Sequence, residues 1–303
     1  MLNNSSYTPI QTIETPLLAE KKVQLLLKRD DEIHPEISGN KWRKLKYNLL
    51  AAKAQQLDTL VTFGGAFSNH IAATAAAGKT FGFKTIGIIR GERIMPLNPT
   101  LALAERCGMN FHFVDRTTYR NADRFALAQQ LCEQPFYFLP EGGTNALARE
   151  GCAEIVAEMR TQLVDLPDYV TVACGTGGTI AGIIEGLKEE SKVIGFSALK
   201  GDFLKDEVAA LLPTSYMNWQ INTDYHFGGY AKWKSPLIDF INQFKQTQGV
   251  SLEPIYTAKM LYGIFDMIQN DHFSIGTSIL AVHTGGLQGI RGFNQRFGNL
   301  IEV

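Results

Sequence analysis

The sequence predicts a protein of the α/β class, in which helices cover both faces of parallel sheets. Short apolar runs alternate with helical stretches of about 10 to 15 residues, which is typical of βαβ units. Several of these runs end in glycine and lead directly into a helix, and no repeat or long linker divides the chain. Because open α/β sheets bind ligands beyond the carboxyl ends of their strands, functional residues are expected at these glycine-rich ends.

Strands are expected at eight apolar runs: residues 23–30, 59–65, 85–91, 110–115, 136–142, 169–175, 193–199 and 278–286. Helices are expected in the stretches that follow: residues 41–56, 69–82, 97–107, 120–133, 146–162, 179–189, 234–247 and 258–269. The regular alternation of the two kinds of segment is the pattern of a parallel sheet with helical crossovers.

Composition narrows the class of protein further. The 303 residues suffice for two domains, and 45% hydrophobic with 19% charged residues is an ordinary globular balance. A net charge of −1 gives no electrostatic reason to expect nucleic acid or an anionic membrane as a partner. Residues 1–22 lack the features of a signal peptide, and no apolar run approaches the roughly 20 residues of a membrane span. Scattered cysteines and histidines argue against a metal site, so a cytoplasmic protein is expected.

The segment YVTVACGTGGTIAGI combines an apolar strand with a glycine-rich turn and a helix start. Glycines let several backbone N–H groups converge, and the helix N-terminus adds partial positive charge, so this turn predicts a phosphate cradle. Its spacing matches neither a Walker A loop nor a dinucleotide fingerprint, and a plain tight turn is the alternative. The residues of the turn are Gly175, Thr176, Gly177, Gly178 and Thr179.

Two further strand ends carry polar residues. After Gly64-Gly65, the residues Ser68, Asn69 and His70 open an alanine-rich helix, whose free N–H groups would hold a carboxylate; Ser68 could equally be an ordinary N-cap. Near the C-terminus, His283 and Thr284 precede two glycines, and a buried core histidine is the favoured interpretation there. Tyr230 and Tyr256 could be core aromatics, although small neighbours suggest close backbone approach instead.

Residues 34–48, HPEISGNKWRKLKYN, place one lysine directly after a Gly-Asn turn into a helix. The helix dipole is unfavourable for an ammonium at this position, and a desolvated or positively flanked site lowers the pKa of an amine. Both effects favour Lys41 as a nucleophile, including Schiff-base formation. A solvated helix face is the expectation for the other basic residues, Arg43, Lys44 and Lys46. A reactive lysine with a phosphate cradle and no metal motif suggests pyridoxal phosphate.

In this order, the motifs resemble the 1-aminocyclopropane-1-carboxylate deaminase/D-cysteine desulfhydrase family of pyridoxal-phosphate enzymes, of fold type II (tryptophan synthase β-like). The matching stretches are KRDDEIHPEISGNKWRKLKY, TLVTFGGAFSNHIAATAAAG, VACGTGGTIAGI, FGGYAK, PIYTAKM and HTGG. The resemblance implies two open, twisted, mostly parallel sheets flanked by helices. It also implies a large domain of residues 1–47 plus 146–303, a small domain of residues 48–145, and a homodimer.

The resemblance assigns roles to the candidate residues. Lys41 would hold the cofactor covalently, Asn69 would bind its 3′-oxygen, and Gly175 to Thr179 would bind its phosphate. Ser68, Asn69 and His70 would receive the substrate carboxylate, with Ser68 also active in proton transfer. Tyr230 and Tyr256 would be catalytic residues near the ring. Asn145 is interpreted as a helix cap.

Within the family, cyclopropane deaminases have Glu after the second tyrosine and Leu after the late histidine. This chain has Thr257 and Thr284 at these positions, so a neutral hydroxyl, and not a carboxylate, is expected near the pyridine nitrogen. A pyridine ring beside a neutral hydroxyl is a weaker electron sink, which is sufficient when a good leaving group departs from the β-carbon. This favours conversion of D-cysteine to pyruvate, ammonia and hydrogen sulfide. The alternatives are cyclopropane deamination, a racemase or dehydratase on the same scaffold, and a non-catalytic binding protein for the cofactor or an amino acid.

Overall fold

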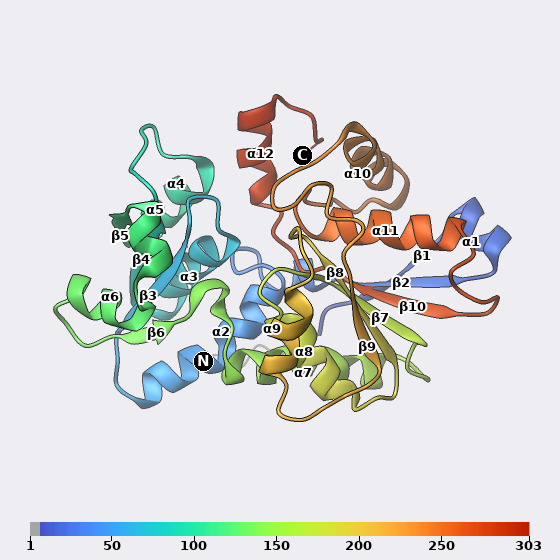
Figure 1. Ribbon diagram of the computed structural model, residues 1–303, viewed down its shortest axis with the longest axis horizontal. Helices are drawn as coiled ribbons and strands as arrows, with labels where there is room; N and C mark the ends of the chain where they lie inside the picture. Colours follow the sequence, from blue (N-terminus) through green and yellow to red (C-terminus); the bar gives the residue numbers. More distant parts are fainter. Residues whose placement is uncertain (1–6, 303) are drawn as a thin grey trace.

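The computed structural model describes residues 7–302 and has two sheets flanked by helices (Figure 1). The six-stranded sheet has the order β1-β2-β10-β7-β8-β9, and only β1 is antiparallel to its neighbour. Its strands are β1 Ile10–Ile13, β2 Gln24–Lys28, β7 Tyr169–Cys174, β8 Lys192–Ser197, β9 Trp219–Asn222 and β10 Ser278–Val282. The predicted α/β class with mostly parallel sheets is confirmed.

The four-stranded sheet is entirely parallel, in the order β5-β4-β3-β6. Its strands are β3 Thr59–Gly65, β4 Lys84–Arg90, β5 Met109–Val114 and β6 Tyr137–Leu139. All four strands fall within residues 48–145, although the exact boundaries of a small domain stay a prediction.

Twelve α-helices and two short 3₁₀ turns connect the strands within residues 7–302. The helices are α1 Pro16–Lys21, α2 Asn40–Ala54, α3 Asn69–Phe81, α4 Pro99–Arg106, α5 Arg116–Asn121, α6 Arg124–Leu131, α7 Ala146–Gln162, α8 Gly178–Leu187, α9 Leu204–Leu211, α10 Ser235–Gln248, α11 Thr257–Gln269 and α12 Gly289–Phe297. The 3₁₀ turns are η1 Asp30–Glu32 and η2 Glu141–Gly143. No helix among these residues is long and apolar enough to cross a membrane.

The six-stranded sheet lies between two apolar layers. Helices α7 and α8 bury residues such as Ile155 and Ile183 against one face, and α10 and α11 bury Leu237 and Ile264 against the other (Figure 1). Fully buried parallel strands read as continuous apolar runs, which explains why the sequence pattern identified them.

The structure corrects one predicted helix and adds five short elements. Residues 120–133 were expected to form one helix, but Ala122 is extended and Asp123 caps a new helix by accepting from the Ala126 N–H. Strands β1 and β9 and helices α1, α9 and α12 were not predicted. Each has four to nine residues, which is too short for a clear apolar period.

Candidate active site

The turn before α2 places Lys41 beside two other segments of the site. Gly39 has φ +63°, and a Cβ there would lie 1.8 Å from the carbonyl oxygen of Thr284. The Asn40 N–H donates to that same carbonyl at 3.3 Å, and the Asn40 side chain donates to Thr179 Oγ1 at 2.9 Å. Only glycine at position 39 allows this approach, so the Gly-Asn sequence fixes Lys41 between the Thr284 turn and the start of α8.

Lys41 has the electrostatic character of a nucleophilic amine. Its side chain is half-buried, and Nζ donates a long hydrogen bond of 3.5 Å to the Gly142 carbonyl. Desolvation by burial and the neighbouring Lys44 ammonium lower the pKa of Lys41 to about 7. A substantial fraction of the amine is therefore neutral at physiological pH and able to attack a carbonyl carbon.

Lys44 corrects the expectation of a solvated helix face. It is 2% exposed, and Nζ donates to Thr144 Oγ1 at 2.9 Å and to the Gly142 carbonyl at 3.2 Å. It forms no ion pair with any of residues 7–302, and burial lowers its pKa. Since buried charges in proteins are normally paired, this ammonium fits an anionic ligand. Lys41 and Lys44 are three residues apart, which puts both on one helix face. This spacing was the sequence signal that Lys44 could lie in the site beside Lys41.

The glycine-rich turn after β7 forms a cradle around the Lys44 ammonium. Gly177 has φ +72°, and a Cβ on Gly178 would lie 2.7 Å from Thr144 Oγ1 and 3.0 Å from Lys44 Nζ. The hydroxyls of Thr144 and Thr176 are 2.7 Å apart. Backbone N–H groups at the start of α8, two hydroxyls and one ammonium therefore surround one small space, and this donor set fits a phosphate group.

The start of α3 brings Ser68, Asn69 and His70 to the carboxyl end of strand β3 in the four-stranded sheet. Ser68 Oγ accepts a hydrogen bond from the Ile71 N–H at 3.3 Å, so Ser68 is the N-cap of α3, which was one of its two interpretations. Asn69 Oδ1 accepts from the Gln288 side chain at 3.0 Å, and its amide nitrogen lies near Gly286. These contacts link the α3 start to the segment that follows Thr284.

His70 is a buried, neutral imidazole of one tautomer. The Thr62 hydroxyl donates its single hydrogen to the Leu139 carbonyl at 3.0 Å, so His70 Nε2, 2.8 Å from Thr62 Oγ1, must carry the ring proton. Nδ1 is then an acceptor, and it has no partner among residues 7–302. Desolvation and the two lysines hold the His70 pKa well below its usual value. A lone pair repels a carboxylate, so only the backbone N–H of His70 suits that ligand.

Tyr256 and Tyr230 lie together on the other side of the site. Their ring centroids are 6.1 Å apart in an edge-to-face arrangement, and Tyr230 is 44% exposed. A Cβ on Gly175 would lie 3.1 Å from Tyr256 Cε1, so Tyr256 packs directly on the beginning of the cradle. Burial raises the pKa of both phenols, which are therefore neutral near pH 7.

Thr257 and Thr284 are buried neighbours, with their hydroxyl oxygens 3.4 Å apart. The nearby Glu253 carboxylate accepts hydrogen bonds from the backbone N–H groups of Ile255, Tyr256 and Thr257, at 2.6 to 2.8 Å. Its oxygens are thus engaged in holding the start of α11. Glu253 was not expected from the sequence, because only the fold shows that these three N–H groups converge on it.

His283 is a buried core histidine, as the favoured interpretation expected. Its Nε2 lies 2.9 Å from the Ser251 carbonyl, and its Nδ1 accepts from the Gly285 N–H at 3.1 Å. Both ring nitrogens are engaged, so the ring fixes the turn that carries Thr284 and takes no further ligand.

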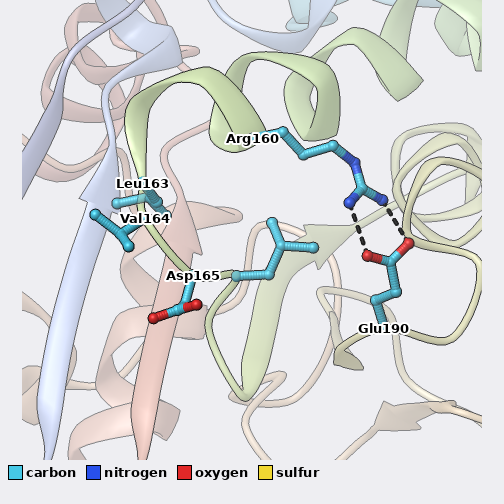
Figure 2. Close-up of a pocket in the computed structure, with 6 residues that line it drawn as sticks. Arg160, Leu163, Val164, Asp165 and Glu190 are labelled. Atoms are coloured by element: carbon cyan, nitrogen blue, oxygen red, sulfur yellow. Dashed lines mark hydrogen bonds and ion pairs between the residues drawn. The ribbon is translucent and has the colours of Figure 1, made fainter.

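A separate hollow lies where α7 leads into β7, away from these residues. It is lined by Arg160, Leu163, Val164, Asp165, Leu166 and Glu190 (Figure 2). Arg160 and Glu190 form a bidentate ion pair, with two hydrogen bonds of 2.7 Å each. No lysine, cysteine or serine of residues 7–302 lines this hollow, so the reactive amine belongs to the site around Lys41 and not to this surface.

Comparisons with known proteins identify the family of this chain. Residues 4–285 match the family model described as pyridoxal-phosphate dependent enzyme. A bifunctional D-cysteine desulfhydrase/1-aminocyclopropane-1-carboxylate deaminase of Arabidopsis thaliana, described as mitochondrial, is 34% identical over 309 residues, covering 93% of this chain and 77% of that protein. A putative 1-aminocyclopropane-1-carboxylate deaminase of Thermotoga maritima is 32% identical and covers 93% and 95%.

A solved structure supports the same relationship. The crystal structure of a protein described as an ACC deaminase homologue has a TM-score of 0.82 and 28% identity, covering 97% of this chain and 94% of that one. The family model names pyridoxal phosphate as the cofactor of this family. The chain is thus an enzyme of the pyridoxal-phosphate-dependent 1-aminocyclopropane-1-carboxylate deaminase/D-cysteine desulfhydrase family.

Proposed function

We propose that this enzyme converts D-cysteine to pyruvate, ammonia and hydrogen sulfide by α,β-elimination. The observation that carries the proposal is the pair of neutral hydroxyls of Thr257 and Thr284, 3.4 Å apart. The carboxylate nearest to Thr257 in the sequence, Glu253, is engaged by three backbone N–H groups. A cofactor ring beside neutral hydroxyls is a moderate electron sink, which suffices when a thiolate leaves.

The residues divide into a cofactor set and a substrate set. Lys41 would hold the cofactor covalently, Asn69 would bind its 3′-oxygen, and the turn from Gly175 to Thr179 would bind its phosphate together with Lys44. Thr257 and Thr284 would place a neutral hydroxyl near the pyridine nitrogen. The cofactor, when bound, supplies the electron sink that makes the α-proton of an amino acid acidic.

The substrate set lies at the start of α3. The N–H groups of Asn69 and His70 bind the α-carboxylate at the positive end of the helix dipole, while the Ser68 N–H is engaged by the Gly65 carbonyl at 3.0 Å and only the Ser68 hydroxyl can face the substrate. The Lys41 amine would accept the α-proton of the substrate, because its low pKa leaves much of the amine unprotonated. Ser68, Tyr230 and Tyr256 assist proton transfer at the β-position. The homodimer and the cytoplasmic location stay predictions.

An assay of three substrates tests the proposal. Purified protein with pyridoxal phosphate is given D-cysteine, L-cysteine or 1-aminocyclopropane-1-carboxylate, and pyruvate and sulfide are measured. We expect both products from D-cysteine, with a kcat/KM at least about 10-fold above that of the other two, which corresponds to a difference of about 1.4 kcal/mol. The names of the relatives include cyclopropane deamination, and a preference for that substrate would contradict the proposal.

Replacing Lys44 with methionine is expected to weaken cofactor binding about 10- to 150-fold, because a hydrogen bond from a charged donor contributes about 1.5 to 3 kcal/mol. The loss of the neighbouring ammonium also raises the pKa of Lys41. The dissociation constant is measured by titration with pyridoxal phosphate. Lys46→Met on the same helix is the matched control, because Lys46 forms a partly exposed ion pair with Glu154 at 2.6 Å. Equal affinities of the two variants would contradict the assignment of Lys44.

A further inference from the structure

Lys259 is a second buried lysine, outside the cradle. It is 2% exposed and is the third residue of α11, where the helix dipole disfavours a cation. Burial lowers the pKa of Lys259 to about 8, while the Glu253 carboxylate opposes that change. A buried ammonium in this position is costly, so its contacts should show what it does.

Both hydrogen bonds of the Lys259 ammonium go to one loop between β9 and α10. Nζ donates to the carbonyls of His226 and Gly229, each at 2.9 Å. The next residue along the chain is Tyr230, which contacts Tyr256 edge-to-face. The ammonium therefore holds the backbone immediately before a tyrosine of the site.

The loop has a backbone that needs such support. Phe227, Gly228, Gly229 and Ala231 all have positive φ, at 54°, 99°, 117° and 55°. Such conformations are costly for the two non-glycine residues and persist only where the surroundings hold them. Within the loop, only short-range bonds such as Gly229 N–H to the His226 carbonyl, at 3.0 Å, help to fix this shape.

One face of α11 makes further contacts with the loop. Asp266 accepts from the Tyr225 hydroxyl at 2.7 Å, and the Tyr262 ring lies edge-on to Phe227 at 5.1 Å. Lys259, Tyr262 and Asp266 are spaced three and four residues apart, so they share that helix face. Helix α11 begins at Thr257, beside the site, so its first turns connect the site to the loop (Figure 1).

We propose that Lys259 is a positioning residue, whose ammonium clamps the 226–230 loop so that the Tyr230 hydroxyl stays in place for proton transfer. The proposal rests on the role of Tyr230 in the proposed function. Lys259 itself does not touch the reacting atoms. It acts through two backbone carbonyls, which a methionine of similar length cannot bind.

The first test measures the loop directly and requires no substrate. In Lys259→Met, hydrogen exchange of the peptide covering residues 225–233 should become at least about 10-fold faster than in the wild type, because each local bond contributes about 1 kcal/mol or more. Peptides of the four-stranded sheet should not change. Lys205→Met, at an exposed position of α9, is the control. Unchanged exchange in residues 225–233 would overturn the clamp, even where the proposed reaction itself fails.

The second test measures coupling to Tyr230. Lys259→Met should lower kcat about 10- to 100-fold, since a misplacement of about 1 Å can cost that much, with a smaller change in KM. Tyr230→Phe should lower kcat similarly, and the double variant should be no slower than the slower single variant. The proposal would be overturned if the loss of kcat in the double variant equalled the product of the two single losses. Full activity of either single variant would also overturn it. If Lys259→Met does not fold, Lys259→Gln replaces it. Its shorter, neutral side chain holds the two carbonyls less tightly, so exchange in residues 225–233 must still be faster than in the wild type and the coupling to Tyr230 must have the same sign.

Discussion

Lys41→Ala is expected to abolish turnover and the visible absorbance that the cofactor acquires when it is bonded to a lysine. The variant lacks both the amine that holds the cofactor covalently and the base that accepts the α-proton. Loss of a nucleophile that also serves as base removes on the order of 10⁴-fold or more of the rate. Spectrophotometric titration with pyridoxal phosphate and a pyruvate assay measure the two effects.

The Lys41→Ala variant should keep its fold and some cofactor affinity. Lys44 and the Gly175–Thr179 turn are intact, so the phosphate is still bound. Lys46→Ala is the control, because Lys46 lies five residues further along the same helix in a partly exposed ion pair with Glu154, and this variant should retain both absorbance and turnover. Turnover above about 1% of the wild-type rate in Lys41→Ala would contradict the assignment, given the size of the loss expected for a nucleophile.

Arg43→Met is expected to lower the free energy of unfolding by about 3 to 5 kcal/mol, the loss typical of a broken buried ion pair. Arg43 is 1% exposed and donates from two nitrogens to Asp30, at 2.5 and 2.7 Å. It also donates to both oxygens of Glu158, at 2.8 and 3.0 Å. Without Arg43, the Asp30 carboxylate stays buried and loses its charged partner, which is the source of the loss.

Chemical denaturation of the protein without cofactor measures this effect. The control is Arg160→Met, which breaks the solvent-exposed ion pair with Glu190 and should cost about 0 to 1 kcal/mol (Figure 2). Cofactor affinity should also fall in Arg43→Met, because the network anchors the helix that carries Lys41 and Lys44. A loss of less than 1 kcal/mol, as expected of surface pairs, would show that the network does not stabilise this helix.

The fold class was predictable because buried parallel strands are continuous apolar runs. The strand of residues 59–65 was predicted to the residue, and so was the helix of residues 146–162. Lys41 was also predictable as a candidate, since a Gly-Asn turn before a helix limits what can stand there. These features are local in sequence, and the sequence displays them directly.

Lys44 and Arg43 were wrongly expected to be solvated because their partners are remote in sequence. Lys44 is buried against Thr144 and Thr176, which lie 100 and 132 residues away, and Arg43 is paired with Glu158, 115 residues away. Charge alone does not reveal such partners. Burial of a charge depends on which segments the two sheets bring together, and that is a property of the tertiary fold.

The identity of the lysine that binds the cofactor is the central claim, and one measurement tests it directly. The protein is loaded with pyridoxal phosphate, reduced with borohydride to fix the lysine bond, digested, and mapped by mass spectrometry. We expect the modification on Lys41, whose amine has a pKa of about 7. Stoichiometric modification of Lys44, Lys259 or any other lysine, with Lys41 unmodified, would contradict the account.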